Sequence, residues 1–188
     1  MLDILYNLDF QILLFINQTL SNPIFDFIMP LFDKVKNWIP FILIFWLLLC
    51  YLDKKNRKKL LILIPLVILI GDQIGKFIKH LEFRDRPWVS LGEFINHLGG
   101  NGGKHYSFPS NHALNISSIS IIFSSIYKDY SRYIWCYAII IIFSRVYIGV
   151  HYPSDVLVGA AIGILVGISC FKCYEKNNLK CFFRKSHF

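Results

Sequence analysis

The chain has 188 residues, of which 55% are hydrophobic, 16% are aromatic and only 17% are charged. This composition is too apolar for an ordinary soluble domain, and the apolar residues are bunched into long runs instead of following an amphipathic period. The formal net charge of +8 would suit nucleic acid, but the basic residues cluster beside the apolar runs, so anionic lipid headgroups explain them better and no nucleic-acid partner is expected.

The N-terminal segment is ambiguous. Leu8–Leu20 is apolar but contains Asp9, Gln11, Asn17 and Gln18, and Asn22-Pro23 breaks it before a second apolar run from Ile24 to Phe32. One kinked spanning helix and an interfacial helix followed by a re-entrant turn both fit this pattern, and we expect the spanning helix. Met1-Leu2-Asp3 has no basic leader and no small-residue cleavage site, so no cleaved signal peptide is expected.

Five further apolar runs are near bilayer length, and they predict helices at 37–52, 58–79, 110–127, 132–150 and 154–174. Together with the N-terminal segment they predict an all-α polytopic membrane helical bundle of about six transmembrane helices. We expect a single domain over residues 1–188, with a motif-bearing core at 58–174 and a basic tail at 175–188. Gly159, Gly163 and Gly167 recur every four residues, which is typical of close helix packing.

The basic residues predict the orientation of the helices. The loop around residues 53–59 holds five Lys or Arg, and with the region at 128–132 and the C-terminal tail it collects twelve of the chain's twenty. Because the side richer in Lys and Arg faces the cytoplasm, we expect this side and the C-terminus to be cytoplasmic. The opposite helix ends then face the periplasm or cell exterior, or a lumen in a eukaryote.

Three polar clusters interrupt the apolar chain, each at an end of a predicted helix. Residues 79–87 follow the second of the five runs, residues 109–112 open the third, and residues 144–155 join the fourth to the fifth. Along a path that crosses the membrane alternately, all three clusters come to the same, outward side. They can therefore form one site, with the glycine-rich loop at 99–103 as a flexible, ligand-adjacent segment.

The clusters contain the groups that a metal-free hydrolysis of a phosphate ester needs. A phosphate monoester carries close to two negative charges, so the reaction requires fixed cations, a nucleophile in line and an acid for the leaving oxygen. Lys79, Arg86 and Arg145 supply the cations, and each guanidinium can bind two oxygens. Ser110 and the amides of the helix that begins near it can add neutral donors.

His151 and Asp155 are four residues apart, and Pro153 between them is well placed in a first helical turn. The Asp155 carboxylate is therefore expected close to the His151 ring, where it can accept one ring N–H and leave the other nitrogen free to attack phosphorus. His112 is then available as the acid. Basic residues at helix ends are commonly only anchors, but six suitable residues at three converging helix ends favour a site.

The order and spacing of these residues resemble the type 2 phosphatidic acid phosphatase (PAP2) superfamily, which also includes glucose-6-phosphatase and vanadium-dependent haloperoxidases. The matching motifs are K-x6-RP (Lys79, Arg86, Pro87), P-S-x-H (Pro109, Ser110, His112) and SR-x5-H-x3-D (Ser144, Arg145, His151, Asp155). The resemblance implies the family's six-helix membrane architecture, with a PAP2/haloperoxidase-like core.

The same resemblance implies a role for each matching residue. His151 is expected to be the nucleophile that forms a phosphohistidine, Asp155 to orient it, and His112 to protonate the leaving group. The implied phosphate-binding residues are Lys79, Arg86, Ser110 and Arg145. No metal and no other cofactor is implied.

Some polar residues lie outside this pattern. The family's usual glycine in P-S-G-H is Asn111 here, and because asparagine tolerates positive φ better than most residues we expect the turn to survive. The departure from glycine puts in question whether the backbone amide at this position lies as close to the phosphate as in the family. Asp72 either steadies a basic residue or makes an interhelical hydrogen bond. Four residues could contact a second phosphate or a lipid headgroup, or else be solvated loop residues: Arg84, Asp85, Lys104 and His105.

We therefore expect a metal-independent membrane lipid phosphatase that acts at the outer membrane–water boundary. A compact chain favours lipids over sugar phosphates, and the resemblance points to a polyprenyl diphosphate or lipid A 1-phosphate, with phosphatidylglycerol phosphate and phosphatidic acid also open. One alternative is a lipid phosphotransferase, because an acceptor other than water can intercept a phosphohistidine. Another is a catalytically silent lipid-phosphate binding or transport protein. A haloperoxidase is disfavoured by the multiple spans, and the oligomeric state is left open.

Overall fold

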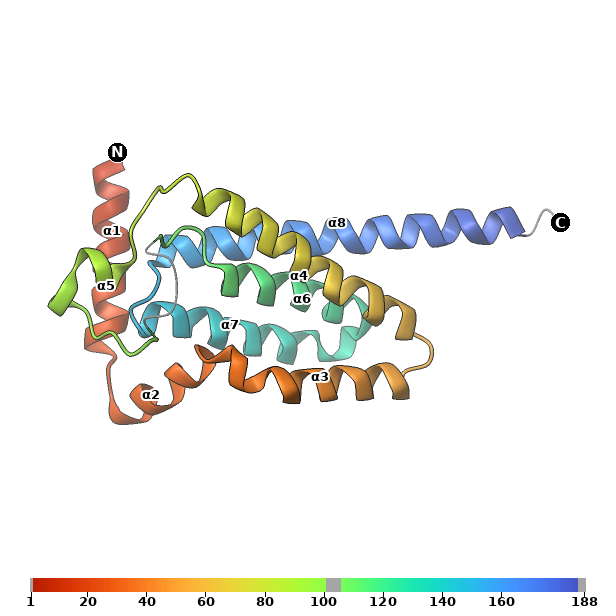
Figure 1. Cartoon of the computed structure of the whole chain (residues 1–188), viewed down its shortest axis with the longest axis horizontal. Helices are drawn as coiled ribbons and strands as arrows, with labels where there is room; N and C mark the ends of the chain where they lie inside the picture. The colour runs from red at the N-terminus through yellow and green to blue at the C-terminus, as the bar shows by residue number, and fades with distance from the viewer. Residues whose placement is uncertain (1, 101–105, 186–188) are drawn as a thin grey trace.

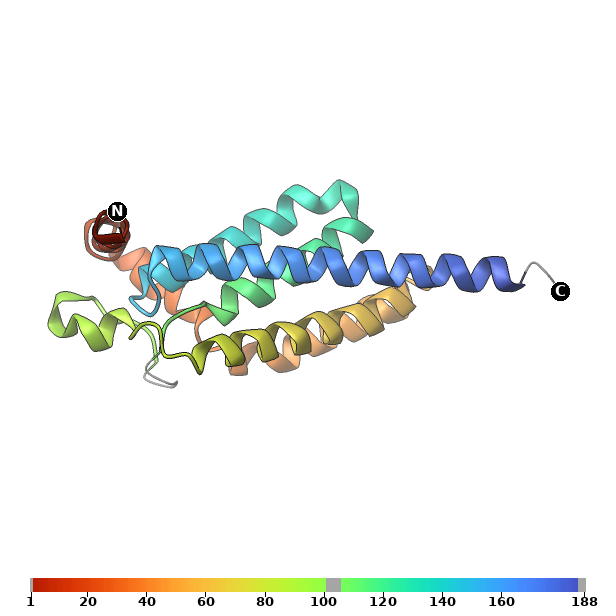
Figure 2. The ribbon, with the colours of Figure 1, turned by 90° about the horizontal axis from the view of Figure 1, so that it is seen from above.

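The computed structural model describes residues 2–100 and 106–185, without the side chains of residues 2–3, 35–36 and 177–185. Five long helices form an elongated bundle in this part of the chain: α3 (Val35–Leu52), α4 (Arg57–Lys79), α6 (Asn111–Ile126), α7 (Ser131–Tyr147) and α8 (Pro153–Lys185). Figures 1 and 2 show that they run roughly along one axis, with α8 projecting beyond the others at its C-terminal end. The predicted all-α helical bundle is confirmed.

The five predicted helices correspond to these five, but two helix ends differ. α7 ends at Tyr147 instead of residue 150, because Gly149 adopts a φ of 74°, in the left-handed region that commonly terminates helices. α8 continues to Lys185, so the segment predicted as a tail from residue 175 is helical as far as the structure describes it.

The central helix, α6, is held between α4 and α8 by glycine contacts on both sides. On α8, a Cβ atom added to Gly163 would lie 2.1 Å from the carbonyl oxygen of Leu114, and one added to Gly159 would lie 2.5 Å from that of Ser110. On α4, a Cβ atom at Gly71 would lie 2.5 Å from the Leu114 side chain. The glycine repeat is therefore a packing surface, as its spacing predicted.

The N-terminal segment is sharply bent, and its first half does not run with the bundle. Its elements are α1 (Leu2–Leu14), the π-helical turn η1 (Phe15–Thr19), α2 (Pro23–Ile28) and the 3-10 turn η2 (Met29–Phe32). The two halves meet at 100°. Asn22 caps α2 by accepting a hydrogen bond from the Phe25 N–H at 3.0 Å, and Pro23 cannot continue the preceding helix. α1 thus crosses the end of the bundle (Figure 1), which favours the interfacial alternative over a sixth span along the bundle.

The polar residues of the N-terminal segment have partners at this end of the bundle. Asn17 is fully buried, and its Nδ2 donates to the carbonyl oxygens of Tyr147 at 2.7 Å and Asn96 at 3.0 Å. Leu13 of α1 belongs to a buried cluster that also contains residues of α6, α7 and α8. α1 is therefore packed onto the loops that end the bundle.

The connections contain three short elements: α5 (Pro87–Ser90), η3 (Gly92–Phe94) and η4 (Lys128–Tyr130). The first two belong to the long connection between α4 and α6. That connection and the turn between α7 and α8 lie at the same end of the bundle as α1 (Figure 1). The α3–α4 connection lies at the other end, so the polar clusters meet at one end, as expected from the alternating path.

Two helices of the described residues are long and apolar enough to cross a membrane, α4 and the part of α8 up to Lys176, and the bent N-terminal pair would be a third if it formed one span. By length and composition these candidates account for part of the expected six transmembrane helices, and the full number of spans stays a prediction. α3 is 18 residues long, and within the residues whose side chains are described its apolar part is Asn37–Leu52. α6 has several buried serines, and α7 is 17 residues long and buries Arg145.

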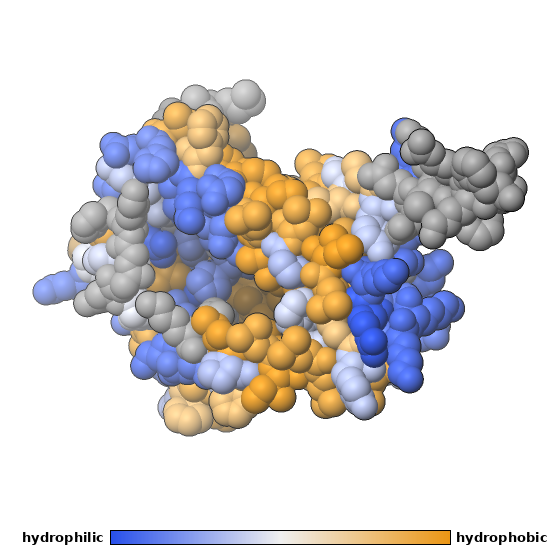
Figure 3. All heavy atoms as spheres, turned by 45° about the vertical axis from the view of Figure 1, so that its right-hand side comes forward, coloured by the Kyte–Doolittle hydropathy of each residue, from blue (hydrophilic) through white to orange (hydrophobic). Residues whose placement is uncertain are grey.

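The surface has an apolar belt between two polar ends. Side chains on the outer face of α3 are large, apolar and exposed, among them Phe41, Ile44 and Leu48. Figure 3 shows such residues as an orange band with hydrophilic residues on either side of it. A belt of this kind matches the hydrocarbon layer of a bilayer. The protein is an integral membrane helical bundle, and its polar clusters lie beyond one edge of the belt.

Candidate active site

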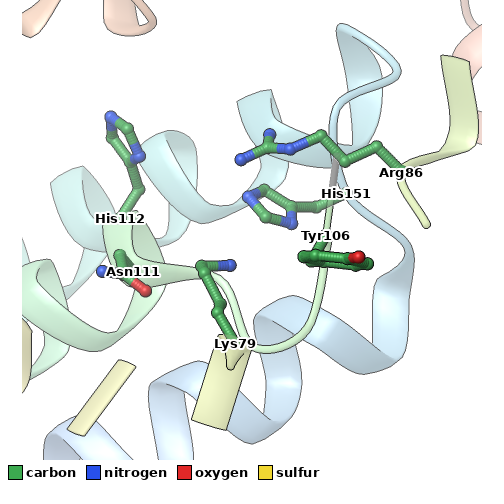
Figure 4. A pocket seen from close by; sticks show the side chains of 6 residues that line it. All are labelled: Lys79, Arg86, Tyr106, Asn111, His112 and His151. Carbon is green, nitrogen blue, oxygen red and sulfur yellow. The ribbon is translucent and has the colours of Figure 1, made fainter. Parts of the chain in front are cut away.

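The three polar clusters surround a cavity of about 220 Å³ at the end of the bundle. The side chains that line it come from α4, the α4–α6 connection, the start of α6 and the turn before α8: Lys79, Arg86, Tyr106, Asn111, His112 and His151. Figure 4 shows them arranged around one space. Of the seven residues that the motifs predicted to act on phosphate, four are in this wall: Lys79, Arg86, His112 and His151.

The turn between α7 and α8 holds His151 in the cavity wall. The positive φ of Gly149 lets the chain fold back, and the N–H groups of Val150 and His151 both donate to the Arg145 carbonyl oxygen at 3.2 Å. Burial lowers the pKa of the His151 imidazole to about 4, although Asp155 opposes that shift. The ring is therefore neutral near pH 7, which is the form that can act as a nucleophile.

Asp155 lies against the His151 ring. Its Oδ2 atom is 3.5 Å from His151 Nδ1 and accepts a hydrogen bond from the Tyr152 N–H at 2.8 Å. Ser107 joins the pair, because its hydroxyl lies 3.2 Å from His151 Nδ1 and donates to Asp155 Oδ2. These contacts engage Nδ1 and leave Nε2 as the ring nitrogen available to a substrate.

Lys79 and Arg86 bring positive charge to the cavity wall. Lys79 Nζ donates to the carbonyl oxygens of Ser107 at 3.1 Å and Pro109 at 2.6 Å, which fixes the ammonium group beside the start of α6. Arg86 Nη1 donates to the carbonyl oxygen of Val150 at 3.3 Å, in the turn before His151. An anion in the cavity would lie close to both cations and could accept charge-assisted hydrogen bonds from them.

Arg145 does not line the cavity. Its side chain is 1% exposed, and Nη1 donates to Asp33 Oδ1 at 2.8 Å. The other oxygen of Asp33 accepts the Gly100 N–H at 2.8 Å. Burial alone would raise the pKa of the Asp33 carboxyl, but the Gly100 N–H and Arg145 outweigh it and hold that pKa below its usual value. The predicted phosphate ligand thus has an ionised partner in the connection that precedes α3.

Ser110 is fully buried and caps α6 instead of lining the cavity. Its Oγ atom accepts a hydrogen bond from the Ala113 N–H at 3.4 Å. Its own N–H donates to the carbonyl oxygen of Asp155 at 3.0 Å. Because Oγ only accepts in this cap, the predicted donor role of the Ser110 O–H stays a prediction, and the backbone of the residue ties the start of α6 to the start of α8.

Asn111 and His112 form the first turn of α6 and line the cavity. Asn111 needs no left-handed backbone, because it is already helical, and among the described non-glycine residues positive φ occurs at Glu82. Its side chain fills a notch on α4, where a Cβ atom on Gly75 would lie 2.3 Å from Asn111 Oδ1. The larger residue at the family's glycine position is thus accommodated by a glycine on the neighbouring helix.

The secondary candidates have different outcomes. Asp72 accepts a hydrogen bond from Asn115 Nδ2 at 2.9 Å, so the interhelical alternative is the one observed. Arg84 does not line the cavity and is ion-paired with α1. Lys104 and His105 lie outside the described residues.

Sequence reasoning missed three residues of this region. Tyr106 lines the cavity, and Ser107 bridges the histidine and the carboxylate. Both precede the second motif by only a few positions, and this closeness in sequence could have indicated that they belong to the site. Asp33 offered none, because it lies 112 residues before Arg145 and only the fold brings the two together.

The arrangement can bind an anion and present a neutral ring nitrogen to it. Two fixed cations and two imidazoles face the cavity, with a buried carboxylate behind one of the imidazoles. Groups of this kind stabilise the charge that develops on phosphate oxygens. Among the described residues, no group of three His, Cys, Asp or Glu side chains is placed to hold a metal ion.

Comparisons with known proteins agree with this geometry. The family model described as the PAP2 superfamily matches residues 60–179, which include all three motifs. The chain is 33% identical over 164 residues to a lipid A 4′-phosphatase of Porphyromonas gingivalis, covering 82% of this chain and 68% of that protein.

Two solved structures have the same fold. Aquifex aeolicus LpxE superposes with a TM-score of 0.73 at 28% identity, covering 88% of this chain and 95% of that one. A transmembrane PAP2-type phosphatidylglycerolphosphate phosphatase from Bacillus subtilis superposes with a TM-score of 0.69 at 21% identity, covering 92% and 87%. The second likeness concerns the fold alone.

Proposed function

Because the chain belongs to the PAP2 superfamily and is a membrane lipid phosphatase of that type, we propose that it hydrolyses a phosphate monoester on lipid A. The observation that carries this proposal is the cavity at the end of the membrane bundle, where a neutral His151 ring meets Lys79 and Arg86. Identity to a lipid A 4′-phosphatase favours lipid A among the lipid phosphates that the motifs leave open. A polyprenyl diphosphate is the second candidate.

In the proposed reaction, Nε2 of His151 attacks phosphorus, so that a P–N bond forms and the ester P–O bond breaks. His112 lines another part of the cavity wall, as labelled in Figure 4, and donates a proton to the leaving oxygen. A water molecule that gives a proton back to His112 then breaks the P–N bond and releases inorganic phosphate. Lys79 and Arg86 stabilise the charge on the non-bridging oxygens throughout.

Three buried residues support this proposed reaction without lining the cavity. Asp155 holds the tautomer of His151 that leaves Nε2 unprotonated. Arg145, held by Asp33, keeps a buried positive charge that acts on His112 in the cavity wall, and its Nη2 has no hydrogen-bond partner among the described residues. Ser110 caps α6 and thereby fixes the helix turn that carries His112.

In the proposed orientation, the site faces the periplasm or cell exterior and the C-terminus is cytoplasmic. The basic residues of the α3–α4 connection, at the end opposite the site, support this orientation. The five bundle helices then cross the membrane. α1 lies along the interface on the site's side, in place of the sixth span predicted from the sequence, because its Asp9 binds Arg84 of the α4–α6 connection and Ser154 in the first turn of α8, both at the site end of the bundle.

The direct test is phosphate release by the purified protein from four lipids in the presence of EDTA: lipid A, undecaprenyl diphosphate, phosphatidylglycerol phosphate and phosphatidic acid. We expect lipid A to be hydrolysed fastest, and His151→Ala to release none while unfolding at the wild-type temperature. His80→Ala, a change at an exposed histidine outside the cavity, is the matched control and should retain activity.

Each other outcome of this panel is informative. Preference for another lipid would correct the substrate, and phosphate that appears on a second lipid instead of in solution would identify a phosphotransferase. Strict dependence on an added divalent metal would contradict the metal-free reaction. Release from none of the four lipids would contradict the proposed function.

A further inference from the structure

Arg84 is enclosed beside the start of α8 and does not line the cavity. Its Nη1 atom donates to Asp9 Oδ2 at 2.6 Å and to Ser154 Oγ at 2.9 Å. Its guanidinium carbon lies 3.3 Å from the centroid of the Tyr152 ring, a cation–π contact that fixes the plane of the group. The motifs assign Arg84 no role, although it stands in the same short segment as Arg86.

Asp9 reaches the same place from α1. It is 8% exposed, although its neighbours on this apolar helix are largely exposed. Its Oδ1 accepts the Ser154 N–H at 2.8 Å and its Oδ2 accepts the Ser154 hydroxyl at 2.7 Å. Asp9 therefore binds the first turn of α8, one residue before Asp155. Figure 1 shows α1 beside the loop that follows α4 and near the start of α8.

Arg84 thus lies between two carboxylates. It is bonded to Asp9, and its Nη1 is 3.8 Å from Asp155 Oδ1. That oxygen is buried without a hydrogen-bond partner among the described residues, and so are Nε and Nη2 of Arg84. Asp155 uses its other oxygen to engage His151. A cation at this distance competes with the imidazole for the same negative charge.

We propose that Asp9 is a positioning residue of the phosphatase reaction that acts through Arg84: it holds the Arg84 charge at a fixed distance from Asp155, so that the charge of Asp155 stays directed at His151. This inference rests on the proposed role of His151 as the nucleophile. Neither side chain touches the substrate. α1 thereby becomes part of the reaction centre, although it lies outside the residues 60–179 that the family model matches.

The two substitutions that break this pair act on His151 in opposite directions. Without the Asp9 charge, Asp155 is the nearest carboxylate left to Arg84, and it stabilises a positive charge on His151 less. Without the Arg84 charge, Asp155 acts on His151 undiminished. The other charged or titratable groups that face His151 stay the same in both variants: Lys79, Arg86 and His112.

The test uses the full-length protein in lipid nanodiscs with Asp9→Asn and Arg84→Gln, made singly and together. For Asp9→Asn we expect kcat on the preferred lipid to fall about tenfold with KM within about twofold, because the ground-state phosphate contacts are intact. The double variant should have a higher kcat than Asp9→Asn alone, because it also lacks the Arg84 charge that competes with His151 for Asp155.

The second readout is the pKa of His151, followed by NMR of histidine-labelled protein. We expect Arg84→Gln to raise it and Asp9→Asn to leave the ring unprotonated at pH 5, as in the wild type. Arg84→Lys keeps the positive charge and should leave the pKa at the wild-type value. A purely structural role for the pair would not raise the pKa in Arg84→Gln and leave it unchanged in Arg84→Lys.

Matched controls are Asp129→Asn and Arg132→Gln, which change exposed residues at the other end of the bundle and should leave kcat unchanged. The proposal is overturned if the kcat effects of the two substitutions simply multiply and Arg84→Gln leaves the pKa of His151 in place. If Asp9→Asn does not fold, the Arg84→Gln titration alone decides. Activity retained by His151→Ala would instead contradict the proposed function, because His151 would then not be the nucleophile. That result is separate from the test of Asp9 and Arg84.

Discussion

The protonation state of His151 follows from its immediate surroundings. Burial, followed by the positive charges of Arg86 and Lys79, disfavours a proton on the ring, and the single carboxylate of Asp155 does not outweigh them. An uncharged ring can attack phosphorus at neutral pH without a separate base. Asp155 then stabilises the positive charge that develops on the ring as the P–N bond forms.

This environment predicts an unusual titration. An ordinary histidine with a pKa near 6.5 loses about 25-fold of its unprotonated form between pH 7 and pH 5, whereas His151, with a pKa of about 4, should stay largely unprotonated. The unfolded chain binds this proton more strongly than the folded one, so the His151 contribution to stability is lost as the pH falls from 6.5 towards 4. NMR of the ring carbon of His151 checks this, and a midpoint near 6.5 would contradict it.

At this scale, sequence reasoning identified the residues whose partners are close in the chain. The four-residue spacing of His151 and Asp155 was enough to predict their contact, because one helix turn determines it. The partners of Arg145 and Ser110 could not be predicted in the same way. Arg145 is paired with a residue 112 positions away, and the hydroxyl of Ser110 is used by the helix that it caps.

At the scale of elements, α6 connects the packing of the bundle to the site. Its first turn carries Asn111 and His112, and its next turns are pressed against α4 and α8 through glycines. Small residues at such contacts allow close van der Waals packing, which is the main force between helices in lipid. The position of His112 therefore depends on contacts made well inside the bundle.

Gly163→Ala should disturb that contact. The added Cβ atom would lie 2.1 Å from the Leu114 carbonyl oxygen, and the backbone there cannot move aside without separating α6 from α8. We expect a loss of about 1–3 kcal/mol, as for other overpacked sites, measured as a lower thermal unfolding temperature in detergent. Ala161→Val adds more volume at an exposed position of the same helix and should have little effect. Equal effects of the two substitutions would contradict the packing role.

The bundle helices could be predicted from apolar runs, because each run needs only a bilayer or neighbouring helices to bury it. The direction of α1 could not. The two decisive polar residues, Asp9 of α1 and Asn17 of η1, are bonded to residues between 75 and 145 positions further along the chain, so their partners are known only once the fold is known. Asp9 and Asn17 are also among the polar residues that made a transmembrane span in the N-terminal segment ambiguous, and their hydrogen bonds hold this segment against the site end of the bundle.

At the scale of the whole molecule, the apolar belt separates a site end from a basic end. The proposed orientation predicts which end a membrane-impermeant maleimide reaches in spheroplasts. In a chain whose five native cysteines are replaced, Glu93→Cys at the site end should be labelled directly, and Asp129→Cys at the other end only after permeabilisation. Both positions are exposed, so access depends on the side of the membrane. The reverse pattern would invert the proposed orientation.

The central claim is that phosphate passes through His151, and rapid alkaline quenching during turnover of a phosphate-labelled lipid tests it most directly. We predict a base-stable, acid-labile label on the peptide that contains His151, and no label in His151→Ala. Steady release of phosphate without label on His151 at any time, or wild-type turnover by His151→Ala, would contradict the claim.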